Sequence, residues 1–302
     1  MPAVARIDPK DVFTAEEWAR LSPRSSWLGL ALVACAWALI VAAGALFVLW
    51  PNPLSYVLAV MLIGARQLGL AILMHDAAHG ALHPNAKIND WVGEWLCAAP
   101  TGTRLEAYRA YHLKHHRYTE QPEDPDLSLS APFPITRTSL WRKVVRDLTG
   151  QTFLKQRRAQ LFGNRPPGWL VNPSTAHFLI FNALLLAALS AAGYWWTYFA
   201  LWLAPMATWL PLVTRLRNIA EHAVVNTNDD PFSHARTTYA NILERLFIAP
   251  YWVHFHAEHH VFMHVPCYRL ERMHRMLMDK GYWSRMTIAP GYPAVLREAA
   301  SA

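Results

Sequence analysis

The sequence is poor in cysteine and in charge. Its three cysteines, Cys35, Cys97 and Cys267, are far apart, odd in number and never in a CxxC pair among the 302 residues. This pattern excludes a disulfide framework and offers no iron–sulfur or thiol-redox motif. Charged residues make up 16% of the chain and are almost absent from its longest apolar runs. Such a distribution is typical of a membrane protein and argues against a soluble globular one.

Two further features are missing. The first residues do not have the pattern of a signal peptide, because several charged side chains precede any apolar run. The net charge of +7 would allow nucleic-acid binding, but the sequence contains no nucleic-acid motif and its Lys and Arg residues flank the apolar runs. Membrane orientation explains those charges better. We therefore expect a membrane partner and no nucleic acid.

Four apolar runs are each about long enough to cross a bilayer as a helix. They cover residues 27–50, 54–74, 176–192 and 194–213. The turns near Asn52 and Gly193 carry no Lys or Arg, whereas the termini and the central segment are rich in both. The positive-inside rule therefore places the termini on the cytoplasmic side.

The predicted architecture is an all-α integral membrane protein with one domain over residues 1–302. Residues 1–26 form a cytoplasmic tail, the four spans form two hairpins, and residues 75–175 and 214–302 form a helical cytoplasmic cap. Within the cap, residues 137–168 are basic and amphipathic, so we expect a helix there against anionic lipid.

One cluster of histidines is a candidate metal-binding site. His112, His115 and His116 stand at i, i+3 and i+4 in the segment 106–118, where we expect a helix. On a helix these positions share one face, so the three imidazoles can converge on one point. Imidazole is the commonest metal ligand among side chains. The alternative for one cluster alone is a histidine-rich surface helix.

Two further clusters weaken that alternative. They consist of His256, His259 and His260, with the same spacing, and of His75 and His79 at i and i+4. The latter pair directly follows the second apolar run. Eight imidazoles are too many for one zinc ion, which usually takes four ligands, and suit two metal ions. Nitrogen-rich sites fit iron, zinc or copper rather than magnesium or calcium.

Other histidines are less informative. His222 follows the fourth apolar run much as His75 follows the second, and Asn218 lies one helical turn before it, so His222 is a further candidate. Three histidines near the clusters stay ambiguous: His83, His254 and His264. Three others are interpreted as packed residues: His177, His234 and His274.

The motifs HDAAH, HLKHH and HAEHH, in this order and between two predicted hairpins, resemble the three histidine boxes of the membrane fatty acid desaturase superfamily. The segment Asn218 to His222 resembles the additional NxxxH element of that superfamily. The resemblance covers roughly residues 55–275. The same boxes occur in acyl desaturases, hydroxylases, acetylenases and carotenoid ketolases, so they do not determine the reaction.

The resemblance implies two Fe ions, with O2 as co-substrate. Carried over by position, the direct iron ligands would be His75, His79, His112, His115, His116, His222, His256, His259 and His260. Asn218 would contribute through a water. Four carboxylates could orient ring N–H groups, namely Asp76, Glu106, Glu221 and Glu258. The acidic stretch at residues 123–126 resembles a common sequel to the second box, with a supporting role.

The substrate implied is a long-chain lipid, and three aromatic side chains could line its pocket: Trp252, Phe255 and Phe262. No cytochrome b5 haem motif or flavin fingerprint is visible, so an external donor of the ferredoxin, rubredoxin or cytochrome b5 type is expected. A basic cytoplasmic face would suit an acidic donor. We expect a multi-pass protein of a bacterial inner membrane, with its active site in the cytoplasm.

Fatty acyl desaturation is the preferred reaction, and lipid or carotenoid hydroxylation or ketolation is the alternative within the superfamily. A membrane zinc hydrolase or a metal-handling membrane protein is the alternative outside it. A hydrolase needs only three or four ligands and an open position for water. A transporter would place its ligands within the spans, whereas these histidines lie at span ends and beyond.

Overall fold

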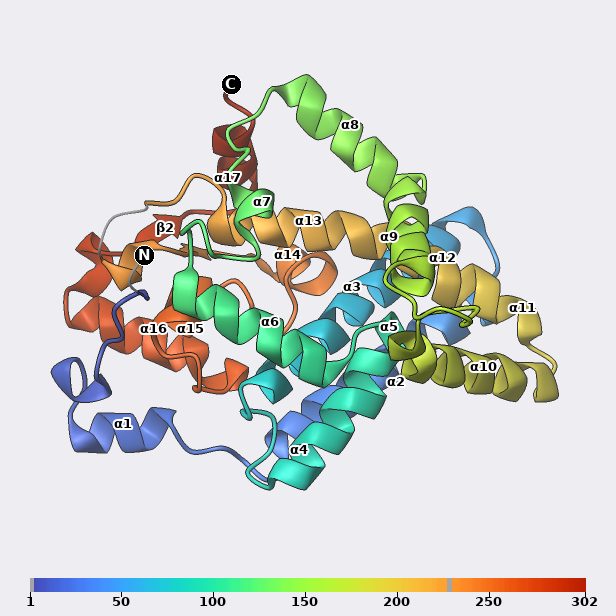
Figure 1. The fold of residues 1–302 in the computed structure, drawn as a ribbon, viewed down its shortest axis with the longest axis horizontal. Helices are drawn as coiled ribbons and strands as arrows, with labels where there is room; N and C mark the ends of the chain where they lie inside the picture. The colour runs from blue at the N-terminus through green and yellow to red at the C-terminus, as the bar shows by residue number, and fades with distance from the viewer. Residues whose placement is uncertain (1–2, 227–229) are drawn as a thin grey trace.

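The computed structural model describes residues 3–226 and 230–302, and its fold is almost entirely helical (Figure 1). Within these residues, four helices are long and apolar enough to cross a membrane. They run over Leu28–Leu49, Pro53–Ala78, Pro173–Ala191 and Trp195–His222. The prediction of an all-helical chain with four spans is confirmed. Its arrangement as two hairpins beneath a cytoplasmic cap stays a prediction.

The first two spans are α2 (Leu28–Leu49) and α3 (Pro53–Ala78), which pack along one another. Asn52 starts α3 by accepting a hydrogen bond from the Ser55 N–H, and Pro53 occupies the first turn, where no N–H partner is needed. Arg66 of α3 is buried and donates to the Leu246 carbonyl at 2.8 Å. The charge inside this span therefore faces the protein interior, which is where charged residues of membrane spans usually point.

The third span continues η3 (Pro173–Thr175) into α10 (Ala176–Ala191). The fourth comprises α11 (Trp195–Thr197), the π-helical turn η4 (Tyr198–Leu203), α12 (Ala204–Ala207) and α13 (Trp209–His222). This helix continues past the apolar run that ends at Val213. It does so because α13 is amphipathic and buries Leu212, Ile219 and Ala220.

Between the second and third spans lie α4 (Ala86–Val92), the π-helical turn η2 (Gly93–Ala98), α5 (Ala99–Thr101), α6 (Leu105–Tyr118) and α7 (Leu127–Ser130). The single basic helix expected over residues 137–168 is wrong. Two helices occur instead, α8 (Arg137–Leu148) and α9 (Gln151–Phe162), and Gly150 separates them with φ +77°. Glycine adopts that left-handed conformation without the steric cost of a Cβ.

The C-terminal part contains α14 (Ile242–Phe247), α15 (His256–Val261), α16 (Leu270–Asp279) and α17 (Tyr292–Ala299). Short 3-10 turns are η1 (Pro9–Asp11), η5 (Pro231–Ser233), η6 (Cys267–Arg269) and η7 (Tyr282–Ser284). The exception to an all-α fold is a parallel pair of strands, β1 (Arg236–Thr238) and β2 (Thr287–Ala289), with Thr237 opposite Ile288.

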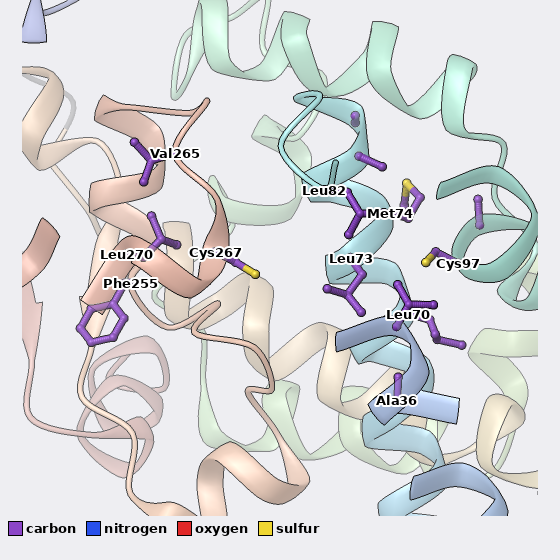
Figure 2. Close-up of a cluster of buried hydrophobic side chains, with 14 of the residues drawn as sticks. Ala36, Leu70, Leu73, Met74, Leu82, Cys97, Phe255, Val265, Cys267 and Leu270 are labelled. Atoms are coloured by element: carbon purple, nitrogen blue, oxygen red, sulfur yellow. The ribbon is translucent and has the colours of Figure 1, made fainter. Parts of the chain in front are cut away.

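The core forms around the second half of α3. Figure 2 shows Leu70, Leu73 and Met74 of α3 beside Ala36 of α2 and Cys97 of η2. On the other side, the loop after α15 approaches α3, and the Cys267 N–H donates to the Asp76 carboxylate at 2.9 Å. The end of α3 is therefore held from both sides.

The N-terminal segment lies against the same region. The Val4 N–H donates to the Arg117 carbonyl at the end of α6, at 2.9 Å. Helix α1 (Ala15–Leu21) follows, and the Phe13 and Trp18 rings pack against Phe262 at centroid distances of 5.4 and 5.5 Å. The segment before α2 thus contacts the C-terminal end of α6 and the residue that follows α15, and Figure 1 shows the N-terminal segment near α15 and β2.

Candidate metal centre

Four helices bring the nine candidate histidines together. His75 and His79 stand at the C-terminal end of α3, and His222 stands at that of α13. The other six project from α6 and α15. Their nitrogen atoms form two groups within which every ligand atom lies within 4.8 Å of every other. The first histidine group is His75, His79, His112, His116 and His259. The second histidine group is His115, His222, His256 and His260.

Each triplet of histidines divides between the groups. His112 and His116 of α6 face the first group, whereas His115 faces the second. The expectation that one triplet converges on one point is therefore wrong. Residues i and i+4 differ by about 40° around a helix, but i+3 and i+4 differ by about 100°, so i+3 serves a neighbouring point. In α15 the same rule sends His259 to one group and His256 and His260 to the other.

The spacing of the nitrogens suits bound metal ions. In the first group, Nε2 of His116 lies 3.0 Å from Nε2 of His112 and 3.0 Å from Nε2 of His259. In the second, Nε2 of His256 lies 3.0 Å from Nε2 of His222 and of His260. Metal–nitrogen bonds of about 2.0–2.1 Å put neighbouring ligand nitrogens roughly 3 Å apart.

Several of these nitrogens have no partner in the described part of the chain. Nε2 of His75 and both ring nitrogens of His79 are buried without a hydrogen bond to any described residue. Leaving a buried polar atom unpaired costs about 1–3 kcal/mol, and a metal ion would satisfy these atoms. The two groups adjoin, because the His116 and His260 rings stack with centroids 4.3 Å apart.

Burial favours the neutral form of several of these imidazoles. It lowers the pKa of His79 to about 3, and the nearby His264 and Arg109 add to this effect by charge repulsion. Burial, followed by repulsion between neighbouring rings, also lowers the pKa values of His112, His116, His256, His259 and His260 well below the ordinary value. A neutral imidazole is the form that binds metal.

Carboxylates contact the far nitrogens of the second group. The His115 Nδ1–H donates to Asp124 at 2.9 Å, which leaves Nε2 of His115 directed at His260. Nδ1 of His222 lies 3.5 Å from Glu120, and Nδ1 of His256 lies 3.4 Å from Glu221. Such contacts fix ring orientation and raise ligand basicity.

The pKa values of two of these carboxyl groups diverge. Burial would raise the pKa of Asp124, but hydrogen bonds from His115 and from the Asp126 and Glu120 N–H groups outweigh it and lower the pKa. Burial raises the pKa of Glu120 to about 7, although the Ser130 hydroxyl that donates to it opposes the shift. Asp124 is therefore the firmly ionised partner of the site.

The other candidate carboxylates lie further from the groups. Asp76 accepts from the Cys267 N–H, and its Oδ1 is 3.8 Å from Nδ1 of His75. Glu258 accepts from Nδ1–H of His274 and from the Thr237 hydroxyl, both at 2.5 Å, so it anchors α15 to α16 and β1 instead of orienting a ring of either group. Glu106 is exposed on α6 and has no hydrogen bond to a histidine among the described residues.

Asn218 lies beside the second group. It lines a cavity of about 50 Å³ together with His112, His115, His222 and His256. Its position on α13, one turn before His222, therefore brings Asn218 to a cavity that four of the histidines also line. A cavity of that size holds at least one water molecule.

The remaining histidines stay outside both groups. Nδ1 of His83 accepts from the Asn85 N–H, the buried ring of His254 packs on Phe255, and Nδ1–H of His264 donates to the His79 carbonyl. The three histidines interpreted as packed also have other contacts. His177 pairs with Glu94, His274 with Glu258, and the His234 carbonyl lies 3.3 Å from Nδ1 of His222.

The three aromatic candidates for pocket lining have mainly structural contacts. Phe255 packs against His274, and the Trp252 indole N–H donates to Glu271 at 3.1 Å. Phe262 does line a cavity of about 170 Å³, which also reaches His116 and His260. Phe262 therefore borders a space next to the histidines.

Two neighbours of the site were not singled out from the sequence. Glu120 lies four residues after the second box, has φ +59°, and places its carboxylate 3.5 Å from Nδ1 of His222. Tyr108 stands one turn before His112 on α6, and its ring stacks on that imidazole at 5.1 Å. The i, i+4 spacing would have revealed Tyr108, whereas the positive φ of a non-glycine residue has no sequence signal.

Comparison with known proteins agrees with this geometry. Residues 51–292 match the fatty acid desaturase family. The match covers most of the chain, so the protein belongs to that family. The family and the four apolar helices together make it an integral membrane protein of the desaturase and hydroxylase type of oxidoreductase.

Two curated relatives differ in the reaction that they are named for. The chain is 29% identical over 244 residues to dihydrorhizobitoxine desaturase of Bradyrhizobium elkanii, which covers 75% of this chain and 69% of that protein. It is 25% identical over 245 residues to beta-carotene ketolase of Paracoccus sp. (strain PC1), which covers 75% of this chain and 84% of that protein.

Proposed function

We propose that the protein is an O2-dependent di-iron oxidoreductase that acts on a long-chain lipid and introduces a C=C bond into a fatty acyl chain. One observation carries the proposal. Nine mostly buried imidazoles form two adjoining groups, each with enough nitrogen atoms to hold one ion. Nitrogen-rich sites of this kind suit iron, and the family and the first relative favour desaturation.

In this proposal each histidine group binds one iron ion. The ligands would be His75, His79, His112, His116 and His259 for one ion, and His115, His222, His256 and His260 for the other. Asn218 would contact the second ion through a water. The donor set fits because its nitrogens are close enough to bind one shared metal ion and several are otherwise unpaired.

Bound iron would supply the activation of O2 and the removal of hydrogen from an unactivated C–H bond. The chain itself would hold the ions and orient the imidazole rings that bind them. Asp124 keeps the proton of His115 on Nδ1, so that Nε2 is free to bind. The burial of His112, His115 and His259 excludes bulk water, which would otherwise compete for the reacting species.

Hydroxylation or ketolation of a lipid or carotenoid is the second candidate. The similarity to beta-carotene ketolase favours it, and the same metal centre would serve both outcomes. A zinc hydrolase is a more distant alternative, because three or four ligands suffice for one, whereas nine histidines converge here.

The proposal includes location and electron supply. Residues 1–302 act as one domain in a bacterial inner membrane, with the termini and the metal centre in the cytoplasm. The absence of Lys and Arg from the turns near Asn52 and Gly193 supports this orientation. Electrons would come from a separate ferredoxin, rubredoxin or cytochrome b5, and the net charge of +7 suits an acidic donor.

Elemental analysis of detergent-purified protein, expressed with ample iron, tests the class. About two irons per chain are expected for two histidine groups. Active protein with one zinc and no iron would overturn the proposal. Lipid analysis of expressing cells then tests the reaction, since new unsaturated acyl chains support desaturation and new hydroxyl or keto lipids support the second candidate.

A further inference from the structure

A cavity of about 270 Å³ lies between α9, the end of α5 and the fourth span. Its apolar wall includes Ala71, Phe153, Met206 and Leu210, and its polar wall is formed largely by threonine, glutamine and arginine side chains. An apolar cavity of about 150 Å³ already admits benzene. This cavity is thus large enough for a polar group and the first carbons of a chain.

The charge in the cavity is of one sign. Two charged side chains line it, Arg157 and Arg215, and no acidic side chain of the described residues does. Arg215 is neutralised by Asp147, with N–O distances of 2.5 and 2.9 Å. Arg157 has no carboxylate partner among the described residues, and its Nε has no hydrogen-bond acceptor there.

The surroundings hold Arg157 in place without neutralising it. Its guanidinium donates to the Thr101 carbonyl at 2.6 Å and to Gln160, and it lies over the rings of Phe153 and Phe178. Burial lowers the pKa of Arg157 to about 10. Arg157 is half-buried, and a partly buried cation without a counter-ion is unfavourable, so a bound anion would offset that cost.

The cavity adjoins the metal centre. Asn218 and Leu129 line both this cavity and the smaller one, whose lining also includes His112, His115, His222 and His256. A molecule with its polar end at Arg157 would therefore have its chain directed past Asn218 to the histidine groups. Ala71 and Leu210 come from the spans, so the route begins beside the apolar part of the fold.

We propose that this cavity receives the anionic end of an amphiphilic substrate, with Arg157 binding a carboxylate or phosphate oxygen while the chain runs past Asn218. The inference rests on the proposed function, because it names the substrate class of that same metal centre. It implies that the position of oxidation is set by distance from the anionic end. An uncharged carotenoid would leave Arg157 unpaired.

Binding of a fluorescent fatty acid to the iron-loaded protein tests this. Parinaric acid and its methyl ester are titrated into protein in neutral detergent. The acid is expected to bind about tenfold more tightly or better, because its carboxylate can accept a charge-assisted hydrogen bond from Arg157 that the uncharged ester cannot match. Equal affinity for acid and ester would overturn the proposal.

Variants then locate the site. Arg157→Gln should remove the preference for the acid, and Arg157→Lys should retain most of it, because charge is kept. Arg158→Gln is the matched control, since Arg158 is exposed on the same helix, and it should leave the preference unchanged. Loss of the preference in Arg158→Gln as well as in Arg157→Gln, or its survival in a folded Arg157→Gln, would contradict the assignment.

A second variant tests the cavity if Arg157→Gln does not fold. Leu210→Trp fills the cavity and should weaken binding of the acid. Unchanged binding of the acid by Leu210→Trp would equally contradict the assignment.

Competition separates the sources of the anion. Laurate and lauryl phosphate should both displace parinaric acid, and inorganic phosphate should not. Displacement by inorganic phosphate as strong as by lauryl phosphate would indicate a free-anion site and overturn the lipid assignment. The metal content is measured on the same samples. Active protein that contains zinc instead of iron and still prefers the acid would refute the proposed reaction, but it would support the lipid-binding site.

Discussion

Nδ1–H of His115 donates to the carboxylate of Asp124 at 2.9 Å, and both side chains are buried, at 3% and 1% exposure. The two residues are nine positions apart, and the turn after α6 brings the Asp124 carboxylate to Nδ1 of the His115 ring. This contact sets which nitrogen of His115 carries the proton. The other nitrogen, Nε2, is therefore left to the second histidine group.

Asp124→Asn should weaken metal binding to the second group by roughly ten- to a hundredfold, because carboxylates that orient metal-binding histidines contribute on this scale. The measurement is iron retained per chain against a series of chelator concentrations. Glu106→Gln is the control, since Glu106 is exposed on α6. Equal iron retention in Asp124→Asn and Glu106→Gln would show that the contact does not support a metal.

Alanine at His115 or at His259 should abolish turnover while the protein still inserts into the membrane. Each substitution removes one nitrogen from a different group, and neither residue lies in an apolar span. The readouts are lipid products of expressing cells and the amount of protein in the membrane fraction. His177→Ala is the control, because His177 lies outside both histidine groups, and this variant protein should retain its bound metal. Normal turnover in either test variant would refute the ligand assignment.

Gly29→Ala should destabilise the protein by about 1–3 kcal/mol, the usual cost of overpacking. A Cβ at Gly29 would lie 2.0 Å from the Leu82 carbonyl oxygen, and this backbone is held by Asn89. Gly44→Ala in the same helix meets only Leu201 at 3.7 Å and should be neutral or stabilising. Thermal unfolding in detergent compares the two, and equal melting temperatures would contradict the close approach.

Metal-free protein should lose stability as the pH falls below about 6.5. The folded state holds the pKa of His79 at about 3 and those of other site histidines well below normal. An unfolded histidine binds a proton near pH 6.5. As the pH falls, the unfolded state therefore binds protons before the folded state does. Each such histidine lowers the free energy of unfolding by about 1.4 kcal/mol per pH unit below 6.5.

Melting temperatures of chelator-treated and iron-loaded protein between pH 5 and 8 check this expectation. Both samples should agree in the direction of the change. Iron-loaded protein should start from a higher value, because an ion that binds only the folded state stabilises it. A metal-free sample that is as stable at pH 5 as at pH 7.5 would contradict the buried, neutral state of the rings.

The spacing of apolar runs and histidines predicted the spans and the nine clustered imidazoles, because both signals are local. His75 and His79 share a helix face whatever the rest of the chain does. The division of His115 from His116 between two groups was not expected, although helical geometry contains it. It becomes visible only when α3, α13 and α15 supply the neighbouring rings.

Features that depend on distant segments had no such signal. Strands β1 and β2 are three residues long each, too short for a period of two to stand out. The break at Gly150 required a choice between two helices and one. The cavity at Arg157 draws its walls from segments as far apart as Ala71 and Asn218, so no window of sequence describes it.

The two histidine groups differ in the order in which their residues are synthesised. Four of the five residues in the first group precede residue 117, whereas three of the four in the second group lie at 222 or later. A nascent chain therefore carries nearly all donors of one site long before the other exists. Neither group is complete before α15 is made, but the first then lacks only His259, whereas the second still lacks His256 and His260.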